Sequence, residues 1–166
     1  MNNSAQYDRS MTNMLTKLTF EQDMEKVNEI LRYYIRSDTY LCMNADFFHG
    51  DQNGHTYETE PFTEEVTSLR FFYGEENTEV KKIPQRQLVP DWNYITERTD
   101  PVVIYAVHNQ QMVYGYLVVF ANSFDYVVQR MHQFVLTLDS CAGMFVQQES
   151  CLLYTSPSPR DRQKSR

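Results

Sequence analysis

The chain has 166 residues, of which 42% are hydrophobic and 14% aromatic, which is enough to bury the core of one ordinary domain and excludes a disordered protein. Its net charge of −7 makes binding to phosphate backbones or anionic lipid unfavourable, so we expect no nucleic-acid or membrane partner. The three cysteines are widely separated and form no CxxC pair, which excludes a disulfide framework and a zinc knuckle and favours a reducing, cytoplasmic setting.

Two helical segments are predicted at the start of the chain. Met11, Leu15 and Leu18 indicate a helical connecting segment over residues 1–18. The next helix is predicted over Thr19–Ile35, with Thr19 and Gln22 as its capping box. Its apolar residues follow one another at spacings of three and four, which places them on a single helical face: Phe20, Met24, Val27, Leu31 and Tyr34.

The middle of the chain is rich in β-branched and aromatic residues and predicts several strands. The first run, Thr39–Phe48, ends at a polar loop, and the second covers Val66–Tyr73. Residues 75–100 are polar and contain two prolines, so we predict a long excursion there. The clearest pattern is Val102–Ser123, where two β-prone runs flank a short polar turn and therefore predict a hairpin.

A long amphipathic helix is predicted over Phe124–Gln148, capped by Asn122 or Ser123. One apolar stripe follows alternating spacings of four and three: Val127, Met131, Phe134, Leu138, Cys141 and Phe145. Such a stripe either fills the core of its own domain or pairs with a second copy of the chain. We predict a homodimer through this helix and keep core packing as the alternative.

The order of these elements predicts an α+β fold in which an antiparallel sheet carries the N-terminal and the long C-terminal helix on one face, as in GAF and PAS modules. Aromatic residues on the strands could line a small-molecule pocket between the sheet and residues 75–100. The candidate lining residues are Tyr40, Phe71, Tyr73, Tyr105 and Tyr116. Filling of the core is the more common use of such residues.

No catalytic motif is recognisable in the sequence, and we expect neither an enzyme nor a cofactor. The glycines are too widely spaced for a phosphate-binding loop, and no GxSxG sequence is present. One loop contains several residue types that can bind a metal ion, but we interpret it as an ordinary polar loop and not as a metal site. These residues are His49, Asp51, His55, Glu58 and Glu60. Cys42 and Cys141 lie at positions that suit a small apolar side chain, so we do not expect redox chemistry from them.

The composition changes at Cys151, where the sequence becomes rich in Ser, Pro and Arg. Residues 1–150 contain 11 basic and 21 acidic residues, a net charge of −10, whereas residues 151–166 are basic. Either this is a flexible basic tail, or it is not native, because Leu152–Asp161 resembles a translated sequencing adapter. We therefore expect the native chain to continue differently after about Ser150, which makes this sequence a fragment.

Several stretches resemble the GAF-like segment of certain bacterial regulators, in which it lies between a periplasmic-binding-protein-like sensor and an output domain. They are LRFFYGEEN (Leu69–Asn77), QLVPDW (Gln87–Trp92), the predicted hairpin and GMFVQQES at the end of the last helix. The output domain in such regulators is commonly a GGDEF diguanylate cyclase or an AraC-type DNA-binding domain. The resemblance implies a GAF-like sensory domain over residues 19–150 that relays a signal without catalysing a reaction. A receptor for an unidentified small molecule is the alternative.

Overall fold

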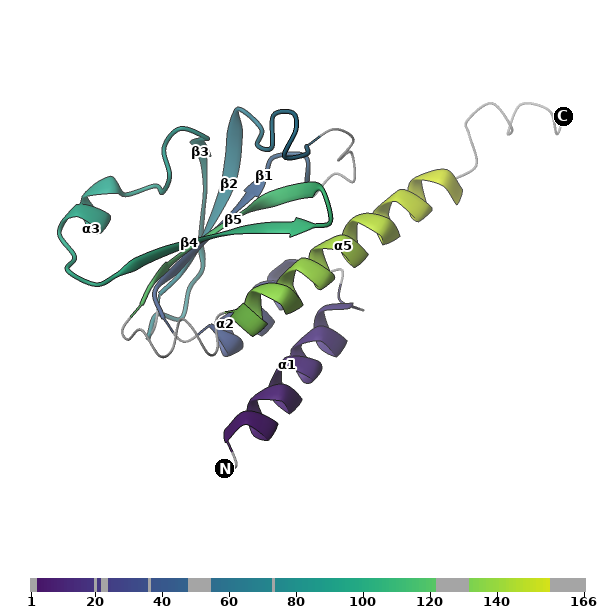
Figure 1. Ribbon diagram of the computed structural model, residues 1–166, viewed down its shortest axis with the longest axis horizontal. Coiled ribbons are helices and arrows are strands. Elements are labelled where there is room, and N and C mark those ends of the chain that lie inside the picture. Colours follow the sequence, from purple (N-terminus) through teal and green to yellow (C-terminus); the bar gives the residue numbers. More distant parts are fainter. Residues whose placement is uncertain are drawn as a thin grey trace, which may run out of the picture.

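The computed structural model describes residues 3–19, 21, 24–35, 37–47, 55–72, 74–121 and 132–155. Helices and strands follow one another in this part of the chain in the order α1 (Asn3–Thr19), α2 (Met24–Tyr34), β1 (Thr39–Asn44), β2 (Glu65–Phe71), β3 (Glu79–Pro84), α3 (Trp92–Thr96), β4 (Val102–Asn109), β5 (Met112–Phe120) and α5 (His132–Thr155). The predicted α+β class is confirmed (Figure 1).

The five strands form one antiparallel sheet in the order β3-β2-β1-β5-β4. Strand β1 lies at the centre, and all six of its residues are buried. The predicted hairpin is confirmed as β4 and β5, which turn at Gln110 with a φ of 53°. Because β1 is buried on both sides, the sheet has a packed layer on each face.

The helix-face core joins α1, α2 and α5 to one face of the sheet. Its buried residues are Met11, Met14, Leu31, Ile35, Leu41, Met43, Phe47, Leu69, Phe71, Val107, Tyr114, Leu117, Val119, Phe134, Val135, Leu138 and Ala142. Figure 1 shows these three helices on one side of the sheet, with α1 and α5 in contact and running in the same direction. The C-terminal end of α5 extends beyond the sheet.

The second-face core lies on the opposite side of the sheet and contains buried residues from four strands and one loop. They are Tyr40, Cys42, Val66, Ile83, Val89, Tyr116, Val118 and Phe120. Partly buried side chains before β2 and between β2 and β4 pack against them: Phe62, Phe72, Leu88, Tyr94 and Ile95. Alternation along β1 produces the two cores, because Leu41 and Met43 point to the helices whereas Tyr40 and Cys42 point away.

Residues 75–100, predicted as a long excursion, contain a strand and a short helix. Strand β3 pairs with β2 along its whole length, and α3 begins after Asp91, whose side chain accepts a hydrogen bond from the Tyr94 amide at 3.3 Å. β3 is an edge strand with mostly exposed, charged side chains, which is how edges resist pairing with other chains. That polar composition concealed the strand from a hydrophobicity pattern.

Helix boundaries also differ from the predicted ones. Thr19 is the last residue of α1, so it does not cap the next helix, which is described from Met24. The described part of α5 begins at His132, and its predicted start at residues 122–131 lies outside the described residues. α5 continues to Thr155, past the domain boundary that the change in composition indicated at residue 150.

Candidate functional site

The predicted relay stripe of α5 lies inside the domain. Phe134, Leu138 and Cys141 are only 2%, 6% and 9% exposed, and Phe145 packs against the helix-face core. Val127 and Met131 lie outside the described residues. The buried part of the stripe therefore packs against the sheet and α1 and is not available as a dimer seam. On the opposite side of α5, Leu136 is 53% exposed and lies between the exposed polar residues His132 and Ser140.

The four described residues of the predicted aromatic pocket do not come together as one set. Tyr40 and Tyr116 belong to the second-face core, whereas Phe71 and Tyr105 pack in the helix-face core. Tyr73 lies outside the described residues. The prediction failed because it placed residues from neighbouring strands in one set without the register, which sends them to opposite faces.

Aromatic side chains fill the second-face core. Tyr94 stacks on Phe72 with their ring centroids 4.6 Å apart and meets Phe120 edge-on at 5.2 Å. The Tyr94 hydroxyl donates a hydrogen bond of 2.6 Å to Asp38, and Arg98 donates to the same carboxylate oxygen at 2.7 Å. This network holds α3 over the sheet and leaves aromatic rings packed where a ligand pocket was predicted.

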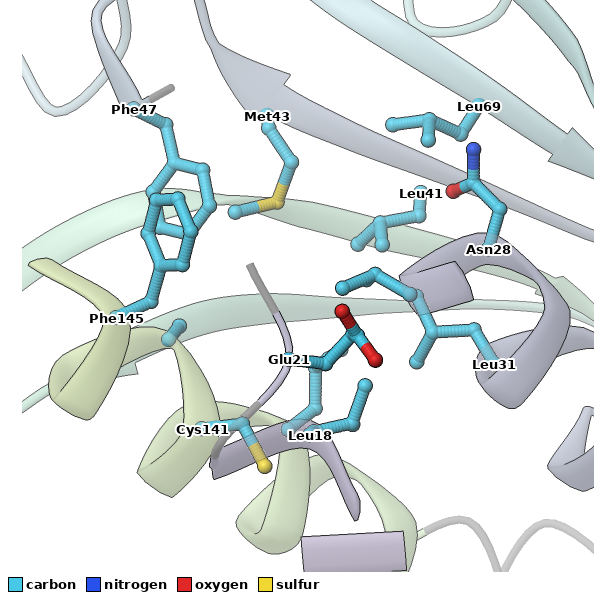
Figure 2. Close-up of a pocket in the computed structure, with 13 residues that line it drawn as sticks. Leu18, Glu21, Asn28, Leu31, Leu41, Met43, Phe47, Leu69, Cys141 and Phe145 are labelled. Carbon is cyan, nitrogen blue, oxygen red and sulfur yellow. The ribbon is translucent and has the colours of Figure 1, made fainter. Parts of the chain in front are cut away.

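A cavity lies on the other face, between the sheet and the three helices (Figure 2). Its volume is about 70 Å³. The residues that line it are Leu18, Glu21, Val27, Asn28, Leu31, Leu41, Met43, Phe47, Leu69, Leu138, Cys141, Ala142 and Phe145. Phe47 and Phe145 stack at one end, with their ring centroids 5.2 Å apart. The cavity is thus bounded by α1, α2, α5 and the sheet together.

Two oxygen-bearing side chains interrupt this apolar lining. Figure 2 shows the Asn28 amide pointing towards the cavity from α2 and the Glu21 carboxylate entering it from the chain between α1 and α2. The Asn28 side-chain oxygen is buried and has no hydrogen-bond partner. Glu21 forms a loose ion pair with Lys26, with 4.0 Å between Nζ and the carboxylate. Neither residue was predicted from the sequence, because the apolar spacing that predicts a helix gives no signal for a single Asn or Glu that enters the core.

The two described cysteine thiols are buried. Burial raises the pKa of the Cys141 thiol to about 12 and also raises the pKa of Cys42 above its usual value. Both are therefore protonated at neutral pH, which disfavours their use as nucleophiles.

Asp46 and His55 form an ion pair beside the end of β1. The distance between His55 Nε2 and the Asp46 carboxylate is 2.6 Å, and His55 Nδ1 lies 3.1 Å from the Glu60 carbonyl oxygen. Burial by itself lowers the pKa of His55, but these two partners outweigh it and the pKa is raised above 6.5. The His55 ring thus bridges two segments of chain, because each ring nitrogen faces an acceptor.

Of the candidate metal ligands named from the sequence, His49 and Asp51 lie outside the described part of the chain. Among the residues that are described, no three His, Cys, Asp or Glu side chains gather closely enough to hold a metal ion. None of the described helices is both long and apolar enough to cross a lipid bilayer. No protein-family model, curated protein or solved structure matches the chain.

Two contacts attach α5 to the β4–β5 hairpin. The Asp139 carboxylate accepts a hydrogen bond of 3.0 Å from the His108 backbone amide. One turn later, Gly143 packs closely against the side chain of Asn109. A Cβ added to Gly143 would lie 2.1 Å from the side-chain nitrogen (Nδ2) of Asn109. The sequence contained a clue to the first contact, because Asp139 is an acidic residue placed directly beside the apolar stripe.

Proposed function

We propose that this domain relays a signal between α1 and α5 without catalysing a reaction, as a GAF-like module of a bacterial regulator. The observation that carries the proposal is the direct contact between α1 and α5 on the same face of the sheet. Any displacement of α1 must be accommodated by the side chains that it shares with α5. A closely packed interior passes such a displacement on because it has little free volume to absorb it.

The shape of α5 supports this role. A helix of 24 residues is about 36 Å long, and it moves as one body when one of its ends is shifted. The Asp139 and Gly143 contacts attach the first half of α5 to the hairpin. The C-terminal end of α5 extends beyond the sheet, in a position to contact an output domain. The output domain that the resemblance implies, a diguanylate cyclase or a transcription regulator, remains part of the proposal.

If the protein forms a homodimer, the two copies must contact each other through a surface other than the predicted apolar stripe of α5. Because Phe134, Leu138 and Cys141 are inside the domain, a second copy would have to contact the side of α5 that carries Leu136. Sedimentation of the wild type and of Leu136→Glu tests this version. Dimerisation that the substitution abolishes supports it, whereas a wild type that stays monomeric at high concentration contradicts it. The relay within one chain does not depend on the result.

Native-state hydrogen exchange tests the relay. Met14 on α1 is fully buried in the helix-face core, and Val89 is equally buried in the second-face core. Met14→Ala should speed the exchange of α5 amides, whereas the matched control Val89→Ala should not when the two variants are compared at equal global stability. If both variants affect α5 equally, α1 and α5 are not specifically coupled and the proposal fails.

A further inference from the structure

The helix-face cavity is lined by apolar side chains and by two side chains that carry hydrogen-bond acceptors, Asn28 and Glu21. We propose that it is a binding site for a small primary amine, whose ammonium group donates to the buried Asn28 oxygen, is favoured by the negative charge of Glu21 on the same cavity wall, and carries a short hydrocarbon chain that lies against Leu31, Leu41 and Met43. The site lies on the opposite face of the sheet from the predicted aromatic pocket. It goes beyond the relay proposal, because binding requires no coupling between α1 and α5.

The cavity is partly open to solvent, and its volume limits the buried part of a ligand to a few carbon atoms. A dry protein cavity of about 150 Å³ holds benzene. The volume here is about 70 Å³, close to half of that, and the walls carry many apolar side chains. A chain of three or four carbons therefore fits, whereas a nucleotide or a drug-sized molecule requires several times this volume.

The buried Asn28 oxygen specifies the kind of head group. It has no hydrogen-bond partner, and an acceptor left in this condition is unfavourable, so a ligand that donates to it gains affinity. A buried acceptor of this kind is uncommon in folded proteins and calls for an explanation. A donor on a bound ligand provides one.

Glu21 distinguishes an amine from other donors. An ammonium group has three donors and a positive charge, so it can donate to the Asn28 oxygen and is also attracted by the Glu21 carboxylate. An alcohol can donate to the same oxygen but carries no charge to interact with Glu21, and a carboxylic acid, ionised at neutral pH, is repelled by Glu21. The net charge of −7 also favours the approach of a cation.

Titration with three ligands of similar size tests the proposal on the intact chain. Propylamine, 1-propanol and propionate are added to the ¹⁵N-labelled protein, and the amide shifts of residues around the cavity are followed. We expect propylamine to bind with a Kd on the order of 1 mM, which is reasonable for four non-hydrogen atoms, propanol at least about tenfold more weakly, and propionate not at all. Equal binding of amine and alcohol overturns the assignment.

Variants locate the binding site. Glu21→Gln should weaken propylamine binding by about fivefold or more, whereas Glu29→Gln makes the same change of charge at an exposed position outside the cavity and should leave Kd within about twofold. Ala142→Leu places extra carbon atoms in the cavity and should abolish the shifts. The proposal is wrong if the two glutamate variants behave alike, or if the folded Ala142→Leu protein binds the amine normally. These outcomes are independent of the exchange experiment on α1 and α5.

Discussion

Asp139 on α5 accepts a hydrogen bond from the backbone amide of His108 on β4, with 3.0 Å between the donor and acceptor atoms. The carboxylate is almost fully buried, and burial raises its pKa above 3.8 although the His108 amide opposes the shift. One side chain thus satisfies a backbone donor of the sheet and attaches the long helix to it. It does so at the cost of removing a charge from water.

Substitutions at Asp139 should separate the hydrogen bond from the charge. Asp139→Asn keeps an oxygen acceptor for His108 and removes the desolvated charge, so its free energy of unfolding at pH 7 should equal or exceed that of the wild type. Asp139→Leu leaves the His108 amide without this acceptor and should lower that free energy by about 1–3 kcal/mol. Urea denaturation measures both values. Equal losses in the two variants would contradict the assigned hydrogen bond.

The same group predicts a dependence on pH. A carboxyl group whose pKa is raised in the folded state stabilises the fold fully below its unfolded pKa, and this contribution is lost as the pH rises through the folded value. The stability of the wild type should therefore fall relative to that of Asp139→Asn as the pH rises above 3.8. Chemical denaturation between pH 3.5 and 7 checks the difference. A constant gap between the two proteins would refute it.

Gly143 should tolerate a methyl group only if Asn109 is shortened. Alanine normally stabilises a helix interior by about 0.5–1 kcal/mol relative to glycine. Here the new Cβ would lie 2.1 Å from the side-chain nitrogen of Asn109, so Gly143→Ala should instead lower the free energy of unfolding. In the Asn109→Ala background the same change should become stabilising. A double-mutant cycle of unfolding free energies measures this reversal of sign, and additive effects would exclude the close contact.

Gly115 on β5 is a second position where only glycine fits. A Cβ there would lie 2.1 Å from the Cys42 carbonyl oxygen and 2.8 Å from the Met43 Cα, both in the backbone of the central strand. Since the backbone of a buried strand cannot move aside as a flexible side chain can, Gly115→Ala should lower the free energy of unfolding by about 3 kcal/mol or more. Thermal or urea denaturation measures the loss. A loss below about 1 kcal/mol would mean that β1 and β5 are less closely packed than described.

The His55–Asp46 pair should stabilise the protein more at acidic than at alkaline pH. Because the pKa of His55 is raised in the folded state, its contribution is complete below pH 6.5 and is lost as the pH rises through the higher folded pKa. For a partly exposed ion pair the change should be roughly 0.5–1 kcal/mol. Comparing wild type and His55→Gln at pH 5.5 and 8.5 measures it. The prediction fails if His55→Gln has the same cost at both pH values.

The sequence by itself determined the strands and helices that bury one face or both faces. The strongly apolar β1, the hairpin Val102–Ser123 and the periodic last helix were all recognisable, because burial imposes a regular spacing on apolar residues. The α+β class followed from their order. The edge strand β3 was missed for the same reason, since its exposed side chains carry no such pattern.

Only the tertiary structure decided which apolar residues share a face and which polar residues enter the core. Strand register sent Tyr40 and Phe71 to opposite sides of the sheet, and the packing of α5 turned a predicted dimer seam into core. The juxtaposition of Glu21 and Asn28 with an apolar cavity depends on how α1, α2, α5 and the sheet meet. These are contacts between residues far apart in the chain, and local periodicity contains no information about them.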